Sequence, residues 1–325
     1  MSHDNVLLKI EGLKVEYYTR AGVVKAVDDV NLLIRRGETV GLVGESGCGK
    51  TTVGLSIMRL LPPNGRIVRG KIIFDGENLL EKSEEEMRRI RGRRISMIFQ
   101  DPMTSLNPLM RIRDHLIETV MTHENVSRDE ALKRAEQIVE MLGIEKERIH
   151  DYPHQFSGGM RQRIMIALAL ILNPDLVIAD EPTTALDVIV QAQILELLKD
   201  LKKKFNMSMI LITHDLSIVS ELTDRVAVMY AGKLVEFADT IKIFEEPFHP
   251  YTEGLLASIP RIDVKQQKLQ SIPGMPPDLI NPPPGCRFHP RCPYAMDICK
   301  EQDPPMVEIE KGRFVKCFRY GGRNA

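Results

Sequence analysis

The octapeptide GESGCGKT, residues 44–51, constrains the fold more than any other part of the sequence. It satisfies the pattern G-x-x-x-x-G-K-[ST], and it lies between the apolar run Thr39–Val43 and a helix-like run that starts TTVGLSIM. A strand, a glycine loop and a helix in this order form a cradle of backbone amides for phosphate groups, with the positive end of the helix facing the anion. The sequence therefore predicts an α/β core with a P-loop that binds a nucleotide triphosphate.

The side chains of this loop have separate expected roles. Lys50 is expected to reach the β- and γ-phosphate oxygens, and the Thr51 hydroxyl is expected to ligate Mg²⁺. Cys48 has two interpretations: a thiol made reactive by the helix N-terminus, or a small side chain that packs, which we favour. The residues expected to contact the nucleotide are Gly44, Glu45, Ser46, Gly47, Cys48, Gly49, Lys50, Thr51 and Thr52.

A pair of carboxylates ends a second apolar run, LVIAD at Leu176–Asp180, because Glu181 follows it directly. Phosphoryl transfer needs a ligand for Mg²⁺ and a base that orients the attacking water. We therefore expect Asp180 to bind Mg²⁺ and Glu181 to position the water. Without the glycine loop, an acidic pair at a strand end would be equally consistent with no catalytic role.

Two polar residues occupy equivalent places after other short apolar runs. Gln100 follows ISMIF, residues 95–99, and His214 follows MILIT, residues 209–213. Open α/β sheets bind their ligands at the carboxyl ends of the strands. We expect Gln100 to contact Mg²⁺ or the water and His214 to contact the γ-phosphate, with a purely structural role as the alternative for each.

Further parts surround this α/β core. Residues 6–74 alternate β-rich runs with turns, which indicates an antiparallel sheet. Between residues 103 and 160 the pattern is helical, with a capping box at Ser127 and Glu130 and a stop at Gly143. A proline-rich tract then leads to the C-terminal end. The predicted division is a nucleotide-binding core over 1–100 and 164–245, a helical part over 101–163, and an extension over 246–325.

The run SGGMRQ, residues 157–162, resembles the LSGGQ signature of ATP-binding cassette (ABC) proteins. Phe156 stands at the leading position and Met160 stands where glutamine is usual, a variant found in the peptide-importer branch. The family's other motifs also occur in order, namely the Q-loop at Gln100, Walker B at 176–181, the D-loop at 185–187 and the switch histidine at His214. The resemblance covers about residues 6–245 and implies a RecA-like P-loop core with an antiparallel β subdomain and a helical insertion.

The resemblance implies a site shared between two subunits. Ser157, Gly158 and Gly159 begin a helix whose positive end can face an anion. In the family that anion is the γ-phosphate held by the P-loop of a second subunit, and Asp187 of the D-loop belongs to the same site. A serine N-cap whose glycines serve only the turn is the alternative.

The resemblance also assigns the base and the metal. It implies that an aromatic residue stacks on adenine, which we expect to be Tyr17, with Tyr18 as the competing choice. It implies that Thr51, Gln100 and Asp180 surround Mg²⁺.

Cys286, Cys292, Cys299 and Cys317 crowd near the C-terminal end. Their spacing lacks the C-x-x-C knuckle that is common in zinc sites. The tail, from HPYTEGLLASIP at residues 249–260 onward, and the run IFQDPMTSLNPLMRI at residues 98–112 both resemble the ATPase subunits of dipeptide and oligopeptide importers. This resemblance implies that the four thiolates ligate a structural [4Fe–4S] cluster, with zinc, free thiols or a disulfide as alternatives.

Charge and hydropathy limit the possible partners. A net charge of −1 gives no overall positive field, so no nucleic acid is expected. The longest apolar run, Ile164–Leu172, is far shorter than the roughly 20 residues that span a bilayer, and the start of the sequence lacks the pattern of a secretory signal. We therefore expect a protein of the cytoplasm.

Motifs and resemblance together imply an ATPase subunit of a dipeptide or oligopeptide importer, bound peripherally at the cytoplasmic face of the membrane. The implied partners are a second, related but different ABC ATPase, two membrane-spanning permease subunits, and an extracytoplasmic solute-binding protein that acts through them. The alternatives are import of oligosaccharides or another small solute, and a soluble ABC ATPase acting on DNA or ribosomes. Those soluble relatives usually carry two cassettes or a long coiled-coil insertion, which this sequence lacks. A binding module without hydrolysis conflicts with the intact Asp180, Glu181 and His214.

Overall fold

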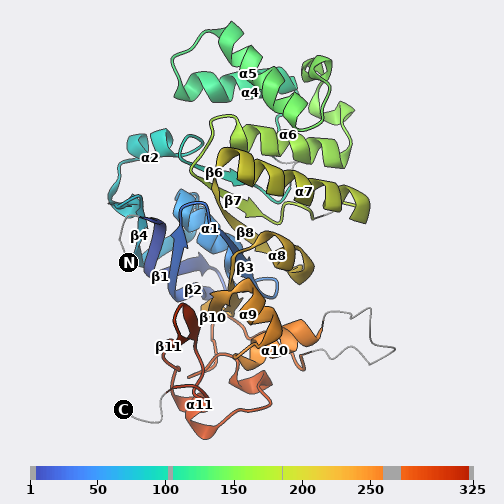
Figure 1. The fold of residues 1–325 in the computed structure, drawn as a ribbon. Coiled ribbons are helices and arrows are strands. Elements are labelled where there is room, and N and C mark those ends of the chain that lie inside the picture. The colour runs from blue at the N-terminus through green and yellow to red at the C-terminus, as the bar shows by residue number, and fades with distance from the viewer. Residues whose placement is uncertain (1–4, 102–104, 185, 259–271, 322–325) are drawn as a thin grey trace. The chain divides into compact units, whose positions relative to one another are not determined.

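The computed structural model describes residues 5–101, 105–184, 186–258 and 272–321 of the chain (Figure 1). The chain forms two compact units. The first consists of Met1–Arg35, Thr39–Leu80 and Ile212–Ala325, and the second of Arg36–Glu38 and Glu81–Leu211. Parts of the predicted P-loop core belong to each unit.

The first unit contains the antiparallel sheet that the sequence predicts. Its strands lie in the order β2-β1-β4-β5, and each neighbouring pair is antiparallel. Alternate side chains of β1 are buried beside partly exposed ones, as in a strand with one face on a core. The strands are β1 (Val6–Thr19), β2 (Gly22–Arg35), β4 (Gly65–Phe74) and β5 (Glu77–Asn78).

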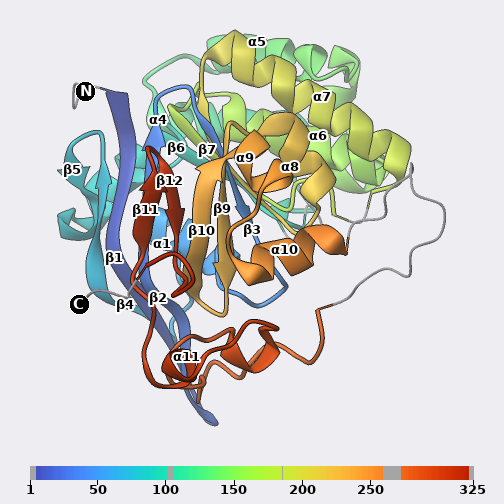
Figure 2. The ribbon, with the colours of Figure 1, turned by 60° about the horizontal axis from the view of Figure 1, so that its bottom comes forward.

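The first unit also holds strands of the α/β core, in the order β11-β12-β10-β9-β3. They are β3 (Thr39–Val43), β9 (Arg225–Tyr230), β10 (Lys233–Asp239), β11 (Val307–Glu310) and β12 (Arg313–Val315). β3 and β9 are parallel and fully buried, which explains their continuous apolar sequences. The β11–β12 hairpin adds to the free edge of β10 (Figure 2). The helices are α1 (Lys50–Met58), α8 (Leu216–Leu222), α9 (Thr240–Glu245), α10 (Pro250–Ala257) and α11 (Asp297–Glu301), with a 3-10 turn at His289–Arg291.

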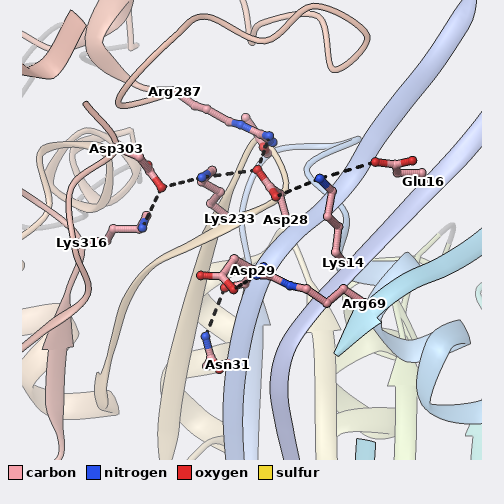
Figure 3. Close-up of polar contacts among 11 residues, drawn as sticks. Lys14, Glu16, Asp28, Asp29, Asn31, Arg69, Lys233, Arg287, Asp303 and Lys316 are labelled. Carbon is pink, nitrogen blue, oxygen red and sulfur yellow. Dashed lines mark hydrogen bonds and ion pairs between the residues drawn. The ribbon is translucent and has the colours of Figure 1, made fainter. Parts of the chain in front are cut away.

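A series of ion pairs, in which acidic and basic side chains alternate, connects the C-terminal part to β2 and β10 (Figure 3). Asp28 of β2 pairs with Arg287 at 2.6 Å and with Lys233 at 3.4 Å. Asp303 pairs with the same Lys233 at 2.6 Å and with Lys316 at 3.0 Å. The Arg287 side chain is only 5% exposed, so its pair with Asp28 is screened less by solvent than a surface pair. These pairs therefore anchor the C-terminal part to β2 and β10 within the first unit.

The second unit combines parallel strands with the helical insertion. β6 (Ile95–Ile98) and β7 (Leu176–Asp180) are parallel and fully buried. β8 (Ser208–Thr213), whose last two residues belong to the first unit, is also buried. The predicted strand ISMIF ends one residue early, because Phe99 is already 36% exposed. Helices α4, α5 and α6 pack together (Figure 1). The helices are α2 (Glu84–Ile90), α4 (Ile112–His123), α5 (Arg128–Met141), α6 (Gly158–Leu170) and α7 (Val188–Phe205), with 3-10 turns at Lys146–His150 and Pro153–Gln155. A further 3-10 turn, Leu79–Glu81, lies where the chain passes from the first unit to the second.

Only one of the two hydrogen bonds of the predicted capping box is present at the start of α5. The Ser127 hydroxyl accepts a hydrogen bond from the Glu130 amide, as expected of an N-cap. The Glu130 carboxylate, however, accepts from Arg134 at 3.2 Å, because that guanidinium lies one turn along the exposed face. A complete box occurs at Ser83 and Glu86, which begin α2. None of the helices that the structure describes is long and apolar enough to cross a bilayer.

Candidate nucleotide site

The glycine loop lies between β3 and α1, as its pattern predicts. Gly49 is the N-cap of α1, with a left-handed φ of 106°. A Cβ atom at Gly44 would lie 2.1 Å from the Met229 carbonyl oxygen, and one at Gly49 would lie 2.3 Å from that of Ala26. Only glycine therefore fits at these positions, because backbone of β9 and β2 approaches the loop closely.

Lys50 is held by the loop itself. Its ammonium donates to the carbonyl oxygens of Gly44 at 2.7 Å and Glu45 at 3.1 Å. The residue is only 6% exposed, so its charge acts in a weakly screened environment. A buried cation enclosed by a glycine turn and a helix N-terminus is suited to an anionic ligand.

Cys48 is a packing residue. It is 4% exposed, and burial raises the pKa of its thiol. The interpretation that the helix N-terminus lowers this pKa is therefore wrong, because desolvation of the thiolate outweighs the attraction of the neighbouring Lys50.

We predict that Cys48 reacts with iodoacetamide at least about tenfold more slowly than free cysteine at pH 7.5, because little thiolate forms. Peptide mass spectrometry after timed labelling measures the rate. The same protein in guanidinium chloride is the control and should label fully. Labelling of the folded protein at the rate of free cysteine would contradict the assignment.

The two tyrosines at the end of β1 have different environments. The Tyr17 hydroxyl lies 3.2 Å from the Thr52 hydroxyl, so this ring lies beside the first turn of α1. Tyr18 is 46% exposed, and its ring faces the guanidinium of Arg66. Because successive side chains of a strand point to opposite faces, only Tyr17 is directed toward the glycine loop's helix.

Gln100 and Glu181 lie together in the second unit because of strand register. β6 and β7 are parallel, with Ile98 opposite Ala179, so the residues two positions later also meet. The Gln100 amide nitrogen donates to a Glu181 carboxylate oxygen at 2.9 Å, and the Thr184 hydroxyl donates to the same oxygen at 2.8 Å. The structure thus brings together two residues that the sequence places at separate strand ends.

The Walker B end of β7 has the geometry of a functional turn. Asp180 is 2% exposed, and Glu181 has a left-handed φ of 46°. That conformation costs a non-glycine residue of order 1 kcal/mol, and such residues cluster at active sites. At this turn the Glu181 carboxylate accepts from the Gln100 amide.

His214 belongs to the first unit and follows β8. It is exposed. Next to it, Asp215 caps α8 by accepting from the Ser217 amide.

The signature residues begin α6 as predicted. Ser157 is the N-cap, and its hydroxyl accepts from the Met160 amide at 3.3 Å. Ser157 and Gly158 are exposed, so the positive end of this helix is open to a ligand. Phe156 and Met160, the two residues that differ from the usual signature, both contact Arg148. The Arg148 guanidinium lies 4.3 Å from the centre of the Phe156 ring and 3.3 Å from the Met160 sulfur.

Asp187 is the N-cap of α7, where its carboxylate accepts from the Val190 amide at 2.9 Å. The next two side chains, Val188 and Ile189, are 81% and 73% exposed. Ala185, the first residue of the D-loop, lies outside the described residues, as do residues 102–104 of the run after Gln100.

A groove of about 540 Å³ lies within the second unit, where β6 ends against α4 and α6. Met97 and Phe99 line it from the β6 side, His115 and Thr119 from α4, and Met165 from α6. No motif in the sequence singles out the residues of this groove.

Cys286, Cys292, Cys299 and Cys317 are free thiols that line one cavity. Its volume of about 10 Å³ is room for about one water molecule. Burial raises the pKa of Cys286 to about 12. Among the described residues, no group of three or more cysteines, histidines or carboxylates has metal-ligand geometry. The four thiols thus share one cavity, but as arranged here they do not form a metal site.

Comparison with known proteins places these features in a family. The sequence profile of the ABC transporter family matches residues 27–184, and that of the oligopeptide/dipeptide transporter C-terminal region matches residues 235–299. The chain is 51% identical to the oligopeptide transport ATP-binding protein OppD of Bacillus subtilis, over 96% of this chain and 88% of the relative. It is 50% identical to the dipeptide transport ATP-binding protein DppD of the same organism, over 96% and 94%.

A solved structure has the same fold. It is the ATP-binding cassette MJ0796, a dimer in a post-hydrolysis state bound to ADP and Pi, with a TM-score of 0.65 and 28% identity over 72% of this chain and 99% of that chain. The predicted α/β cassette fold, with its P-loop core, antiparallel β subdomain and helical part, is therefore confirmed. With about half of its residues identical to such relatives over almost its whole length, the chain belongs to the ATP-binding proteins of the oligopeptide/dipeptide ABC transporter family and is an ATPase, for which ATP and Mg²⁺ are the expected ligands.

Proposed function

We propose that this ATPase drives uptake of dipeptides or oligopeptides through separate membrane subunits. The observation that carries the proposal is the match of residues 235–299 to the C-terminal region of oligopeptide/dipeptide transporters, which lies outside the 27–184 match to the general ABC profile. Relatives that match over nearly the whole chain are oligopeptide and dipeptide transport proteins. Oligosaccharides or another small solute remain the alternative cargo.

The proposed roles in hydrolysis follow from the sequence motifs. Lys50 holds the β- and γ-phosphates, and Mg²⁺, which neutralises phosphate charge when bound, would be held by Thr51, Asp180 and Gln100. Glu181 accepts a proton from the attacking water and orients it. The Gln100–Glu181 hydrogen bond supports this role because it fixes the carboxylate that must face the water.

His214 would donate to the γ-phosphate. Its exposure after β8 leaves the imidazole accessible to a ligand.

A second ATPase subunit would complete the site. In this proposal Ser157, Gly158 and Gly159 of one subunit face the γ-phosphate held by the partner, with Asp187 beside them. The exposed start of α6 and the exposed pair Val188–Ile189 support a partner, because apolar side chains of this size are usually covered by another surface. We propose a related but different chain as that partner.

The groove beside α4 would receive a cytoplasmic helix of a permease subunit. Its mixed lining of Met97, Phe99, His115 and Met165 suits an amphipathic helix, and Leu109 nearby in the sequence is 85% exposed. Two permease subunits and an extracytoplasmic solute-binding protein complete the proposed transporter, and this chain would lie on the cytoplasmic face of the membrane. The predicted division into 1–100, 101–163, 164–245 and 246–325 is part of this proposal.

Tyr17 is proposed to stack on adenine. Replacing it by Ala is expected to raise the KM for ATP about 5- to 150-fold, because stacking of a base on an aromatic ring contributes about 1–3 kcal/mol. Tyr18→Ala is the matched control and should leave the KM within about twofold of the original. Steady-state hydrolysis at varied ATP concentration measures both. The reverse order of effects would assign the stacking to Tyr18.

The four C-terminal cysteines are proposed as ligands of a [4Fe–4S] cluster, with zinc as the alternative. Their convergence on one cavity supports a shared ligand. Anaerobic purification followed by iron, sulfide and zinc analysis tests this. Stoichiometric zinc without sulfide would replace the cluster, and the absence of all three would leave free thiols.

Affinity purification of the tagged chain from detergent-solubilised membranes tests the transport function. Co-purification of multispanning proteins is expected, and deletion of the encoding gene should abolish uptake of labelled di- or oligopeptides. Recovery with ribosomes or DNA would support a soluble ABC ATPase instead. Loss of oligosaccharide uptake with peptide uptake intact would identify oligosaccharides as the cargo.

A further inference from the structure

The glycine loop is bound by a part of the chain that the cassette motifs do not include. Glu45, the second loop residue, forms a two-pronged ion pair with Arg291. One guanidinium nitrogen lies 2.8 Å from one carboxylate oxygen, and another lies 3.0 Å from the other oxygen. Planar two-bond pairing of this kind fixes geometry as well as charge. Arg291 lies in the C-terminal cysteine segment, here residues 286–317, directly before Cys292.

Arg291 is itself held in place. Its Nε donates to the Pro273 carbonyl at 2.9 Å, and one terminal nitrogen donates to the Tyr230 hydroxyl at 3.3 Å. The side chain is 6% exposed, whereas that of Glu45 is 27% exposed. A fixed cation thus meets a partly exposed loop carboxylate, so the arginine is positioned to determine where the loop lies.

A second contact holds the backbone of the same loop residue. The Glu45 amide donates to the Tyr251 hydroxyl at 2.8 Å. Tyr251 packs against Tyr230 and Phe288, with ring centroids 4.6 and 5.5 Å away. Both the side chain and the backbone of Glu45 are therefore attached to the aromatic cluster beneath the cysteine segment.

A different arginine, Arg287, attaches the C-terminal cysteine segment to the rest of the first unit. Arg287 pairs with Asp28 at 2.6 Å and also donates to the Ala231 carbonyl (Figure 3). These contacts attach the segment to β2 and to the turn after β9. Arg291 is consequently not needed merely to attach the tail, and its donors are directed at the glycine loop and the residues around it.

We propose that Arg291 is a positioning residue for the glycine loop, through which the C-terminal cysteine segment sets the affinity of the site for ATP. The guanidinium neutralises and holds the Glu45 side chain, whose unpaired carboxylate would repel the triphosphate, while the Tyr251 hydroxyl keeps the backbone of this loop residue in place. The inference rests on the proposed role of residues 44–51 in binding phosphate.

Replacing Arg291 by Gln tests the inference. The Kd for ATP, measured by titration calorimetry with the hydrolysis-deficient Glu181→Gln background, should rise about tenfold, because a carboxylate beside the triphosphate loses its counter-charge. In the otherwise natural protein the KM should rise with kcat changed by less than about twofold. Arg291→Lys should have a smaller effect, since it keeps the charge but not the paired geometry. An unchanged Kd in Arg291→Gln would overturn the proposal.

Arg319→Gln is the matched control. Arg319 belongs to the same end of the chain, pairs with Glu253 at 3.5 Å, and its guanidinium faces the rings of Tyr294 and Tyr320. Its Kd for ATP should equal that of the unsubstituted protein. A tenfold loss there as well would mean that any disturbance of the tail weakens binding, which would overturn the specific role of Arg291.

Glu45→Gln separates charge from packing. Alone it should tighten ATP binding about threefold, because Arg291 then adds an uncompensated positive charge. Combined with Arg291→Gln it should restore the Kd to within about twofold of the original, the non-additivity expected of directly interacting groups. A double variant as weak as Arg291→Gln would overturn the proposal, and so would weaker or unchanged binding in Glu45→Gln alone. The Glu45→Gln result also carries the test if Arg291→Gln fails to fold.

Lys50→Ala distinguishes failure of this inference from failure of the proposed site. If Lys50→Ala retains full ATP binding, the loop is not the phosphate site and both ideas fall. If Lys50→Ala loses binding while Arg291→Gln keeps it, only the role of Arg291 is wrong.

Discussion

Replacing Glu181 by Gln is expected to lower ATP hydrolysis by about 10²- to 10⁴-fold while ATP still binds, because a general base contributes about that factor. The amide has nearly the shape of the carboxylate, so the contacts from Gln100 and Thr184 can be kept with little change in packing. What is lost is the group that takes a proton from water. Phosphate release under steady-state conditions measures the rate, and titration with ATP measures binding.

Glu196→Gln is the matched control for this substitution. Glu196 is an exposed residue of α7, and it lies outside the strand-end cluster of Gln100 and Glu181. Its hydrolysis rate should stay within about twofold of the original. Undiminished hydrolysis in Glu181→Gln would show that Glu181 is not the general base. A simultaneous loss of ATP affinity and hydrolysis would instead indicate a damaged fold.

Replacing Lys50 by Ala should raise the Kd for ATP at least about 30-fold. Removing one partner of a buried, hydrogen-bonded charge pair costs about 2–5 kcal/mol, and 2 kcal/mol already corresponds to about 30-fold. The ammonium also donates to two loop carbonyls, so part of the loss would come from a loosened loop. Titration with ATP in the presence and absence of Mg²⁺ measures the change.

Thermal unfolding of the same variant checks that the loss is local. Lys133→Ala, an exposed substitution in α5, is the control and should bind ATP as the unsubstituted protein does. Binding of ATP by Lys50→Ala with unchanged affinity would show that the glycine loop does not hold the phosphates.

Local patterns predict local structure well in this chain because neighbouring residues impose it. The apolar runs at β3, β7 and β8 are strands within one residue of their predicted ends. Ser157 and Ser127 are N-caps, since a serine hydroxyl satisfies an amide a few residues along the same chain. The Glu130 half of the capping box is absent because the Glu130 carboxylate accepts from Arg134 instead.

Contacts between distant residues required the folded chain. The strand-end positions of Gln100 and Glu181 are visible in the sequence, but their hydrogen bond depends on the parallel register of β6 and β7. The choice between Tyr17 and Tyr18 likewise depends on which face of β1 meets α1, a matter of sheet packing that a pair of adjacent tyrosines cannot reveal.

By itself the sequence determined that this is a nucleotide-binding cassette, because the glycine loop, the strand-end carboxylates and the signature each impose their own backbone and chemistry over a few residues. Only the tertiary structure decided that the tail reaches that loop. Arg291 and Glu45 are 246 residues apart, and no sequence motif links the two residues. They pair because the chain after β10 folds so that the Arg291 guanidinium is buried beside Tyr230. In that position the Glu45 carboxylate is its acidic partner.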